Sequence, residues 1–271
     1  MPDSFGARLR AAVETRGRLC VGIDPHAALL EEWGLGDNAR GLESFAMTAV
    51  EALADEVAVL KPQSAFFERH GSAGIAVLER VVSEARAAGA LVLLDVKRGD
   101  IGSTAAAYAD AYLRPDAPMA CDAVTVSPYL GFGSLAPFFD AAERYQRGVF
   151  VLALTSNPEG PEVQHARVEG GTVAGSMLAQ VALRNRGAEP LGSIGAVVGA
   201  TIGDLSEDVN INGPLLVPGL GAQGGTPADL RELFGDVYTN VLPATARAVL
   251  AAGPDVTALR ESARRTAHEL D

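Results

Sequence analysis

Cysteine, histidine and basic residues are all scarce in this sequence. Its 271 residues include two cysteines, four histidines, and 22 lysines and arginines against 34 aspartates and glutamates, for a formal net charge of −12. Cys20 and Cys121 cannot build a disulfide framework and form no CxxC pair. The histidines lie far apart without metal-site spacing, so we expect no histidine metal site.

The acidic balance and the lack of long hydrophobic runs exclude several kinds of partner. Nucleic acids and anionic membranes require a basic surface, so we expect neither as a partner. No apolar run approaches the roughly 18 residues of a membrane span. Residues 1–17 have the pattern of an amphipathic helix rather than of a signal peptide, and we therefore expect a cytoplasmic protein.

What the sequence does contain is a repeated alternation of short apolar runs and longer alanine-rich stretches. The apolar runs lack strict alternation, which is typical of parallel strands buried on both faces. The eight expected strands cover residues 18–23, 57–61, 90–95, 123–126, 149–154, 194–198, 215–217 and 237–242. The main expected helices cover residues 41–54, 74–88, 103–113, 132–147, 172–186 and 226–234, with a last one from residue 244 onward.

Eight strand–helix repeats in a chain near the usual ~250 residues predict an α/β fold, a single (β/α)8 TIM barrel. Residues 1–17 would form an N-terminal helix, residues 18–250 the barrel, and the rest a C-terminal helix to residue 271. A doubly wound open sheet has the same alternation of strands and helices. The barrel is favoured because polar or turn-forming residues follow every expected strand, and a barrel gathers those strand ends at one mouth: Asp24, Lys61, Asp95, Ser127, Thr155, Gly199, Gly219 and Pro243.

The strongest candidate for chemistry is the pair Asp95 and Lys97 at the end of the third expected strand. A spacing of two places both side chains on one face of the strand. Asp100 follows in the loop, where it could turn back or reach across a subunit boundary. A lysine between two carboxylates has its ammonium form favoured, which suits a proton donor better than a Schiff-base nucleophile. By itself, the pattern DxKxxD is equally typical of a solvated charge run.

Lys61 and Asp24 strengthen the catalytic interpretation. Each closes a buried strand, and a long charged side chain there must face the mouth or be buried with partners, since an unpaired buried charge is very costly. An alternating array of Lys61, Asp95, Lys97 and Asp100 satisfies that requirement. A purely structural salt-bridge cluster would satisfy it too.

A second constellation, rich in glycine, follows the seventh expected strand. Gly219, Gly221 and Gly224 form a literal GxGxxG, but a dinucleotide site would need a second βαβ half, and only one strand remains. We therefore predict a phosphate loop, whose exposed amides are followed by Thr226-Pro227 as the cap of a short helix. Arg247, after the eighth strand, is positioned for a bidentate phosphate contact or is a plain surface cation.

Three other features carry less weight. Ser127, before Pro128, could bond a heterocycle edge or simply be a turn serine. His26 is interpreted as a loop residue rather than a catalyst. The long connection 156–171 is expected to be irregular and could be a flap or an ordered loop, and loops of that length are often functional.

Taken together, these motifs carry a family likeness. Residues 95–104, DVKRGDIGST, resemble the strand-three signature of orotidine 5'-phosphate decarboxylases. Segments 22–25, 61–62, 127–129, 155–158 and 218–225 fall in the order of that family's other motifs, and the likeness spans about residues 18–250. Their order and spacing are most similar to the longer bacterial subgroup, type 2.

The resemblance implies decarboxylation of orotidine 5'-monophosphate to UMP in de novo pyrimidine synthesis, without metal or cofactor. By position, Lys97 would protonate C6 as the carboxylate leaves. Asp95 would lie beside that carboxylate, and Lys61 would complete the charge array while bonding ribose.

The resemblance also implies a homodimer with shared active sites. Asp100 and Thr104 would reach the ribose of the ligand in the neighbouring subunit. The other implied contacts are Asp24 with a ribose hydroxyl, Ser127 with the pyrimidine edge, Gln223 between phosphate and base, Gly224 within the phosphate loop, and Arg247 with the phosphate.

Three rival functions remain open from the sequence. A hexulose-phosphate synthase-like lyase uses DxKxxD with Mg²⁺, and EDTA would abolish its activity. A Schiff-base aldolase would use Lys97 as its nucleophile, which flanking carboxylates disfavour. A non-catalytic barrel that binds a phosphorylated ligand would be stabilised by that ligand without turnover.

Overall fold

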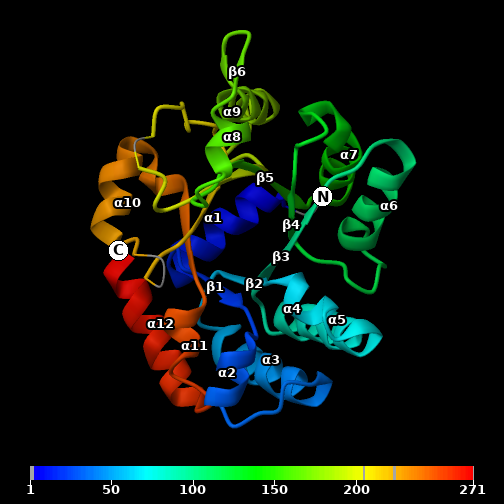
Figure 1. The fold of residues 1–271 in the computed structure, drawn as a ribbon, viewed down its shortest axis with the longest axis vertical. Coiled ribbons are helices and arrows are strands. Elements are labelled where there is room, and N and C mark those ends of the chain that lie inside the picture. Colours follow the sequence, from blue (N-terminus) through cyan, green and yellow to red (C-terminus); the bar gives the residue numbers. More distant parts are fainter. Residues whose placement is uncertain (1–2, 204, 222–223, 271) are drawn as a thin grey trace.

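The structure is a computed structural model that describes residues 3–203, 205–221 and 224–270. Eight parallel strands close into a barrel in the order β1-β10-β9-β8-β5-β4-β3-β2 (Figure 1). This confirms the predicted (β/α)8 barrel and excludes an open sheet. The barrel strands are β1 (Cys20–Ile23), β2 (Val59–Pro62), β3 (Leu91–Arg98), β4 (Ala123–Val126), β5 (Gly148–Leu154), β8 (Ile194–Val198), β9 (Leu215–Pro218) and β10 (Val241–Thr245).

Helices surround this barrel and connect most of its strands. They are α1 (Phe5–Arg16), α2 (Ala27–Glu32), α3 (Ala39–Leu53), α4 (Ser64–Glu68), α5 (Gly71–Ala87), α6 (Gly102–Leu113), η1 (Phe132–Leu135), α7 (Ala136–Tyr145), α8 (Gly160–Gln164), α9 (Val173–Arg184), α10 (Pro227–Phe234), η2 (Gly235–Asn240), α11 (Arg247–Leu250) and α12 (Val256–Leu270). The repeat is incomplete between β8 and β9, where the described part of residues 199–214 contains no helix. No helix in the described chain has both the length and the apolar character to cross a membrane.

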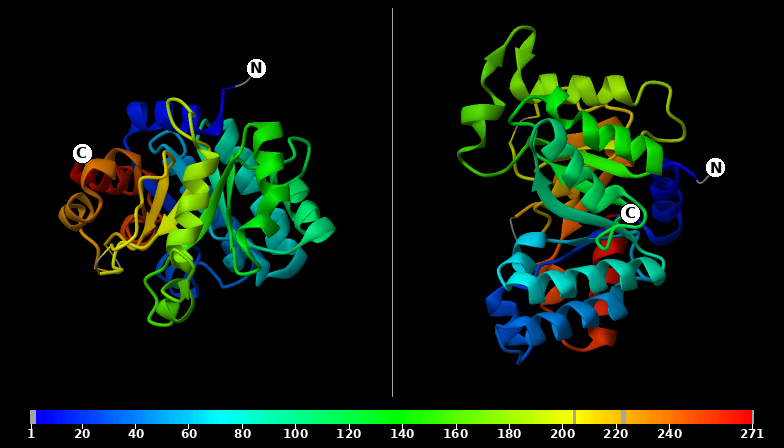
Figure 2. Two further views of the ribbon diagram at one scale, coloured as in Figure 1. Left: turned by 90° about the horizontal axis from the view of Figure 1, so that it is seen from above. Right: turned by 90° about the vertical axis from the view of Figure 1, so that its right-hand side faces the viewer.

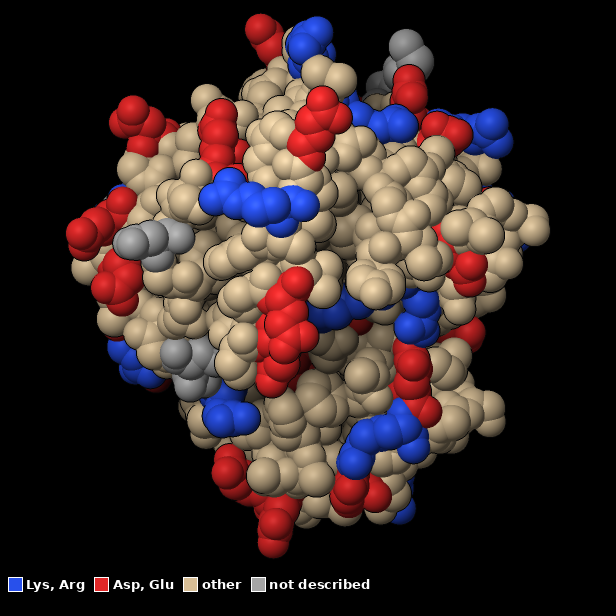
Figure 3. All heavy atoms as spheres, turned by 45° about the horizontal axis from the view of Figure 1, so that its top comes forward, with Lys and Arg blue, Asp and Glu red and all other residues tan. Residues whose placement is uncertain are grey.

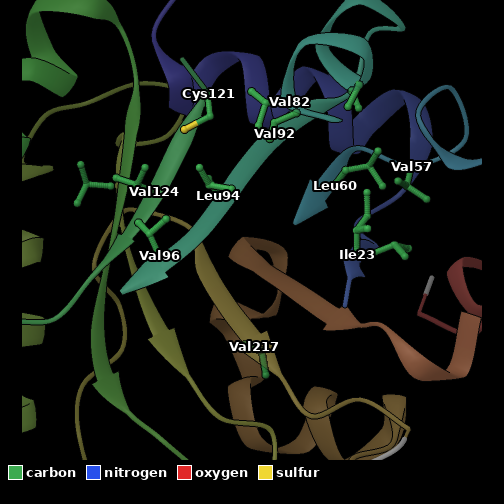
Figure 4. Packing of buried hydrophobic residues seen from close by; sticks show 14 of the residues in the cluster. Ile23, Val57, Leu60, Val82, Val92, Leu94, Val96, Cys121, Val124 and Val217 are labelled. Atoms are coloured by element: carbon green, nitrogen blue, oxygen red, sulfur yellow. The ribbon is translucent and has the colours of Figure 1, made fainter. Parts of the chain in front are cut away.

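Two apolar clusters hold the barrel together. The larger one lies between strands and helices, and Figure 4 shows Val82 of α5 beside Val92 of β3 in it. The smaller cluster joins inward-facing strand residues to α1, which closes the amino-terminal end of the barrel. There Phe5 is 1% exposed and meets the ring of Phe150 edge-on, with ring centroids 6.0 Å apart. Burying such a side chain contributes roughly 1.5–3 kcal/mol.

The predicted position of the last strand was wrong. Residues 237–240 lie in the 3-10 helix η2, and β10 begins at Val241. Tyr238 packs outside the barrel, where its hydroxyl donates to the carbonyl of Leu270 at 2.8 Å. Pro243, which the sequence placed after the strand, pairs with Val217 inside it. The apolar Val237-Tyr238 pair was therefore mistaken for strand sequence although it covers the outer surface.

The segment expected to be irregular contains regular structure. After β5 the chain forms α8 and then an antiparallel hairpin of β6 (Arg167–Val168) and β7 (Gly171–Thr172). This hairpin projects beyond the barrel (Figure 2). At the other end of the chain, the long helix α12 packs on α3 and α11 and buries Leu259 and Ala263. That packing accounts for one face of the C-terminal helix.

Candidate active site

The catalytic candidates lie on three adjacent strands at the mouth of the barrel. Lys61 lies in β2, and Asp95 and Lys97 lie in β3. Asp24 directly follows β1, whose residue Gly22 pairs with Lys61. Because the strands are parallel, their carboxyl ends meet at one rim, as the sequence predicted.

Asp95 is the centre of this group. Its Oδ2 accepts from Lys61 Nζ at 2.8 Å and from Gln63 Nε2 at 3.1 Å. Its Oδ1 accepts from Lys97 Nζ at 2.6 Å and from the Thr125 hydroxyl at 2.8 Å. The carboxylate is only 5% exposed, so these donors take the place of water.

Both buried members of this group are held in their charged forms. Burial alone raises the pKa of Asp95, but the neighbouring Lys61 and Lys97 outweigh it and hold that pKa well below its ordinary value. Burial lowers the pKa of Lys61, but Asp95 and Asp24 outweigh it and raise that pKa above its ordinary value. Lys61 and Asp95 therefore form a fixed ion pair that is buried from water.

Lys97 adopts an unusual backbone conformation. Its φ of 44° is in the left-handed region, which few residues other than glycine enter. The pairing of β3 with β4 is also irregular here, with a register shift between Leu94 and Arg98. Unlike Lys61, the Lys97 side chain is 45% exposed. Its amine thus lies at the boundary between the buried carboxylate and the open mouth.

Asp24 differs from Asp95 because one of its carboxylate oxygens is buried without a hydrogen-bond donor in the part of the chain that the structure describes. Within the described chain, no donor reaches its buried Oδ1. Burial raises the pKa of Asp24, although Lys61 acts in the opposite direction. An unsatisfied buried acceptor costs free energy, and in an enzyme it marks a position where a ligand hydroxyl can donate.

A cavity of about 180 Å³ opens beside Asp24 and leads toward the glycine-rich loop. Its lining includes Asp24, His26, Lys61, Gly219 and Arg247. His26, interpreted from the sequence as a plain loop residue, therefore faces the cavity, where its ring packs on Phe66 with centroids 4.2 Å apart. The cavity is framed by cationic and amide groups, which suits an anionic ligand.

The glycine-rich loop turns tightly and hydrogen bonds to itself: the amides of Gly221 and Gly224 donate to the carbonyls of Gly225 and Gly221 at 2.9 and 2.8 Å. Gly219, Gly221 and Gly224 all have positive φ values, of 113°, 76° and 92°. Thr226 caps α10 through a reciprocal capping box with Asp229, and a proline occupies the first turn, as predicted. Arg247 is exposed and begins α11. Gln223 lies outside the described residues.

The remaining predicted contacts do not line this cavity. The carboxylate of Asp100 accepts from the N–H of Ile101 at 2.8 Å, and among the described residues Asp95 is the only carboxylate paired with Lys97. Thr104 is exposed in the first turn of α6. Ser127 is half-buried after β4 and donates its N–H to the carbonyl of Arg98 at 2.8 Å.

Gln63 and Thr125 were missed in the sequence. Each lies two residues from a predicted site residue, Gln63 after Lys61 and Thr125 before Ser127. Side chains two apart share a face of a strand, so this spacing would have placed both in the mouth. Their uncharged side chains gave no other signal.

No group of three or more His, Cys, Asp or Glu side chains in the described chain is arranged to hold a metal. Acidic and basic side chains are interspersed over the surface that Figure 3 shows.

A closed parallel barrel that gathers an aspartate and two lysines at the carboxyl ends of its strands has the architecture of a TIM barrel, in which active sites lie at that mouth. The chain belongs to the orotidine 5'-phosphate decarboxylase / HUMPS family, whose sequence model matches residues 17–262.

Similar proteins narrow the activity within that family. The orotidine 5'-phosphate decarboxylase of Streptomyces coelicolor is 66% identical over 99% of this chain and 97% of its own length. A Streptomyces avermitilis protein assigned to the same activity has a crystal structure with a TM-score of 0.98 and 63% identity, covering 99% of this chain and 95% of its own. The Leishmania donovani OMP decarboxylase structure has a TM-score of 0.75 and 30% identity, covering 99% and 97%.

Proposed function

We propose that the Asp95-centred charge group decarboxylates orotidine 5'-monophosphate, with Lys97 as the proton donor to C6. The chain is a carboxy-lyase of pyrimidine biosynthesis that forms UMP and CO2, as its family and its named relatives establish. The observation that carries the assignment of roles is the position of Lys97 Nζ, 2.6 Å from a buried carboxylate, on a side chain that is 45% exposed at the carboxyl end of β3.

The charges of Lys61, Asp95 and Lys97 are arranged as the decarboxylation requires. As the bond from C6 to the carboxylate breaks, its electron pair stays on C6 and CO2 departs. The Lys97 ammonium then gives a proton to C6, which forms UMP, and water returns a proton to the amine. Fixed cations at Lys61 and Lys97 stabilise the developing negative charge, and they need no reorganisation because Asp95 already holds them.

Residues in and near the cavity would make the contacts with the phosphate, the ribose and the pyrimidine. The amide of Gly219 and the side chain of Arg247, two residues that line the cavity, would hold the phosphate, and Oδ1 of Asp24, which has no donor within the described chain, would accept from a ribose hydroxyl. Ser127 would bond the pyrimidine edge, and Gln223 would link phosphate and base. Binding the phosphate far from C6 allows its binding energy to order the reacting end.

A homodimer with shared sites explains the position of Asp100 and Thr104. Both lie outside the cavity, and Asp100 directly precedes Ile101, which with Tyr129 and Leu130 is among the large apolar side chains that lie exposed, at 62%, 80% and 54%. Such a surface is typical of a subunit interface. A partner docked there would receive Asp100 and Thr104 at its own ribose site. Soluble nucleotides as substrate and product also support the expected cytoplasmic location.

The assignment of roles is tested by the loss of orotidine 5'-monophosphate absorbance, measured with and without EDTA. We expect turnover that EDTA leaves unchanged and that Lys97→Ala abolishes. Restoration of an EDTA-treated enzyme by Mg²⁺ would favour the metal-dependent lyase. Binding of UMP without any turnover by the wild type would favour a binding barrel.

The shared site is tested by mixing two inactive variants, Asp100→Ala and Lys97→Ala. In a mixed dimer one site receives both native residues, so random exchange should restore about a quarter of wild-type activity. No recovery after demonstrated subunit exchange would mean that Asp100 acts within its own subunit.

A further inference from the structure

The third-strand lysine has a backbone conformation that its own sequence does not favour. Lys97 has a φ of 44°, and neither neighbour is a glycine that could absorb the turn. Such a conformation costs about 1–3 kcal/mol and persists only where surrounding contacts enforce it. We propose that the hydroxyl of Thr125 is the positioning group that enforces it and thereby aims the Lys97 amine at the reacting carbon. This inference rests on the proposed role of Lys97.

The hydroxyl of Thr125 makes three hydrogen bonds at this point. It accepts from the N–H of Val96 at 3.1 Å and from the N–H of Lys97 at 3.0 Å. It donates to Oδ1 of Asp95 at 2.8 Å. A hydroxyl has one proton to donate and two lone pairs, so its capacity is fully used.

The pairing of β3 with β4 explains why a side chain is needed. Leu94 pairs with Val124 and the next paired residues are Arg98 and Val126, so β3 advances four residues while β4 advances two. The extra residues of this bulge lose their partners in the strand ladder. Val96 is buried, and its N–H requires an acceptor. The Thr125 hydroxyl supplies that acceptor, and at 1% exposure of the residue water has little access to replace it.

One oxygen thus couples the two halves of the catalytic pair. It fixes the backbone of Lys97 and orients the Asp95 oxygen that the Lys97 amine contacts at 2.6 Å. Without the hydroxyl, the bulge can relax toward a negative φ, which would turn the lysine side chain away from its present direction. The cavity around Asp24 and the glycine-rich loop does not include Thr125, so ground-state binding of the phosphate and ribose should be spared.

The test compares Thr125→Val, which keeps the shape and removes the hydroxyl, with Thr125→Ser, which keeps the hydroxyl. For Thr125→Val we expect kcat to fall about 100-fold, the loss typical of a misplaced catalytic group, with KM and the Kd for UMP changed less than about threefold. Thr125→Ser should restore kcat to within about fivefold of wild type.

Two results would overturn the proposal. One is a Thr125→Val enzyme with wild-type kcat, and the other is an equal loss in the valine and serine variants, which would indicate packing alone. If the valine variant does not fold, Thr125→Cys against Thr125→Ser gives the same comparison, because a thiol is a weak hydrogen-bonding group of similar size. Lys97→Ala is measured alongside. Near-wild-type turnover by Lys97→Ala would reject the proposed role of Lys97, whereas a strongly impaired Lys97→Ala with a fully active Thr125→Val would reject only the role of Thr125.

Discussion

Two buried aspartates with several cationic partners lie at opposite ends of neighbouring strands. Asp95, near the carboxyl end of β3, is paired with Lys61 and Lys97. Asp122, just before β4, is paired with Arg8, Arg86 and Arg147 at 2.7, 3.3 and 2.9 Å. The two carboxylates are 5% and 3% exposed, so burial does not distinguish them.

Their partners do distinguish them. Two of the arginines around Asp122 also bind the main chain: Arg8 donates to the carbonyl of Gln146 at 3.0 Å and Arg86 to that of Ala120 at 2.9 Å. Asp122 itself accepts from the N–H of Val92 at 3.1 Å. The planar, permanently charged guanidinium groups thus tie α1, α5 and the strand starts together.

The lysines at the mouth have N–H donors that no internal hydrogen bond uses within the described chain. Within the described chain, the amines of Lys61 and Lys97 hydrogen bond only to Asp95, although each ammonium has three protons. A compact ammonium can also release a proton, which an arginine in a protein does not. A buried charge cluster is therefore a catalytic candidate when one of its cations lines a cavity, as Lys61 does, and a structural one when most of its cations also bind the main chain.

The largest expected effect comes from removing the proposed proton donor. Lys97→Ala should lower kcat by at least about 10²–10⁴-fold, the contribution of a positioned acid. Asp95 would keep Lys61, Gln63 and Thr125 as donors, so the fold should persist. Lys97→Arg is the matched control, because it keeps the positive charge but cannot give up its proton. Appreciable turnover by the arginine variant would contradict proton donation and leave only a role for charge.

At the opposite end, truncating the helix that closes the barrel should change stability and not chemistry. Phe5→Ala removes a buried ring and should lower the free energy of unfolding by about 3–5 kcal/mol. Val13→Ala on the same helix is the control, with a smaller loss because Val13 is only half-buried. Denaturant unfolding measures both. A fall in kcat of the folded Phe5 variant would show that the two ends are coupled.

At Asp24 we expect one substitution to change both the stability of the protein and its binding of substrate. Because burial raises its pKa, the ionised form costs stability at pH values above that pKa. Asp24→Asn should therefore raise the melting temperature at pH 7 by a few degrees. It should also weaken substrate binding roughly 10-fold through loss of a charged hydrogen bond.

The difference in melting temperature between wild type and Asp24→Asn should depend on pH. As the pH falls through the raised pKa, wild-type Asp24 becomes neutral, and its melting temperature should approach that of the asparagine variant. Thermal melts of both proteins across the acidic range measure this convergence. A gap that stays constant, or an asparagine variant that is less stable at pH 7, would contradict the burial cost.

The smallest expected effect is that of pH on the Lys61–Asp95 pair. The lowered pKa of Asp95 means that its stabilisation is present above the ordinary value of about 3.9 and is lost only at still lower pH. The raised pKa of Lys61 means that its stabilisation is present below about 10.4 and is lost only at still higher pH. This pair should therefore give kcat no titration limb between about pH 6 and 8. A limb in that range that Lys61→Met removes would contradict the assignment.

Most of the charged residues of the mouth could be predicted from the sequence because they are located at the ends of apolar strands. Asp95 and Lys97 follow from period-two spacing, and Lys61 and Asp24 from their places after apolar runs. The capping of α10 followed from Thr226-Pro227. The segment 156–171 and the last strand were misjudged because exposed hairpins and outer apolar residues imitate loops and strands locally.

Local sequence patterns could not predict the arginine cluster around Asp122 or the role of the Thr125 hydroxyl. Arg8, Arg86 and Arg147 meet Asp122 only because the barrel closes, and no spacing in the chain brings them together. Thr125 owes its importance to a register shift between β3 and β4, which depends on how two strands pair. Long-range geometry, rather than residue type, determines both.

The most direct measurement is a parallel comparison of Asp95→Asn and Asp122→Asn, which remove one charge from each cluster with little change in shape. Both should lower the free energy of unfolding, since each leaves buried cations short of a partner. With kcat measured on the folded fraction, Asp95→Asn should lose more than about 10³-fold. Asp122→Asn should keep kcat within about twofold of wild type. Equal losses of kcat in the two variants, or an active Asp95→Asn, would contradict the division between a catalytic mouth and a structural base.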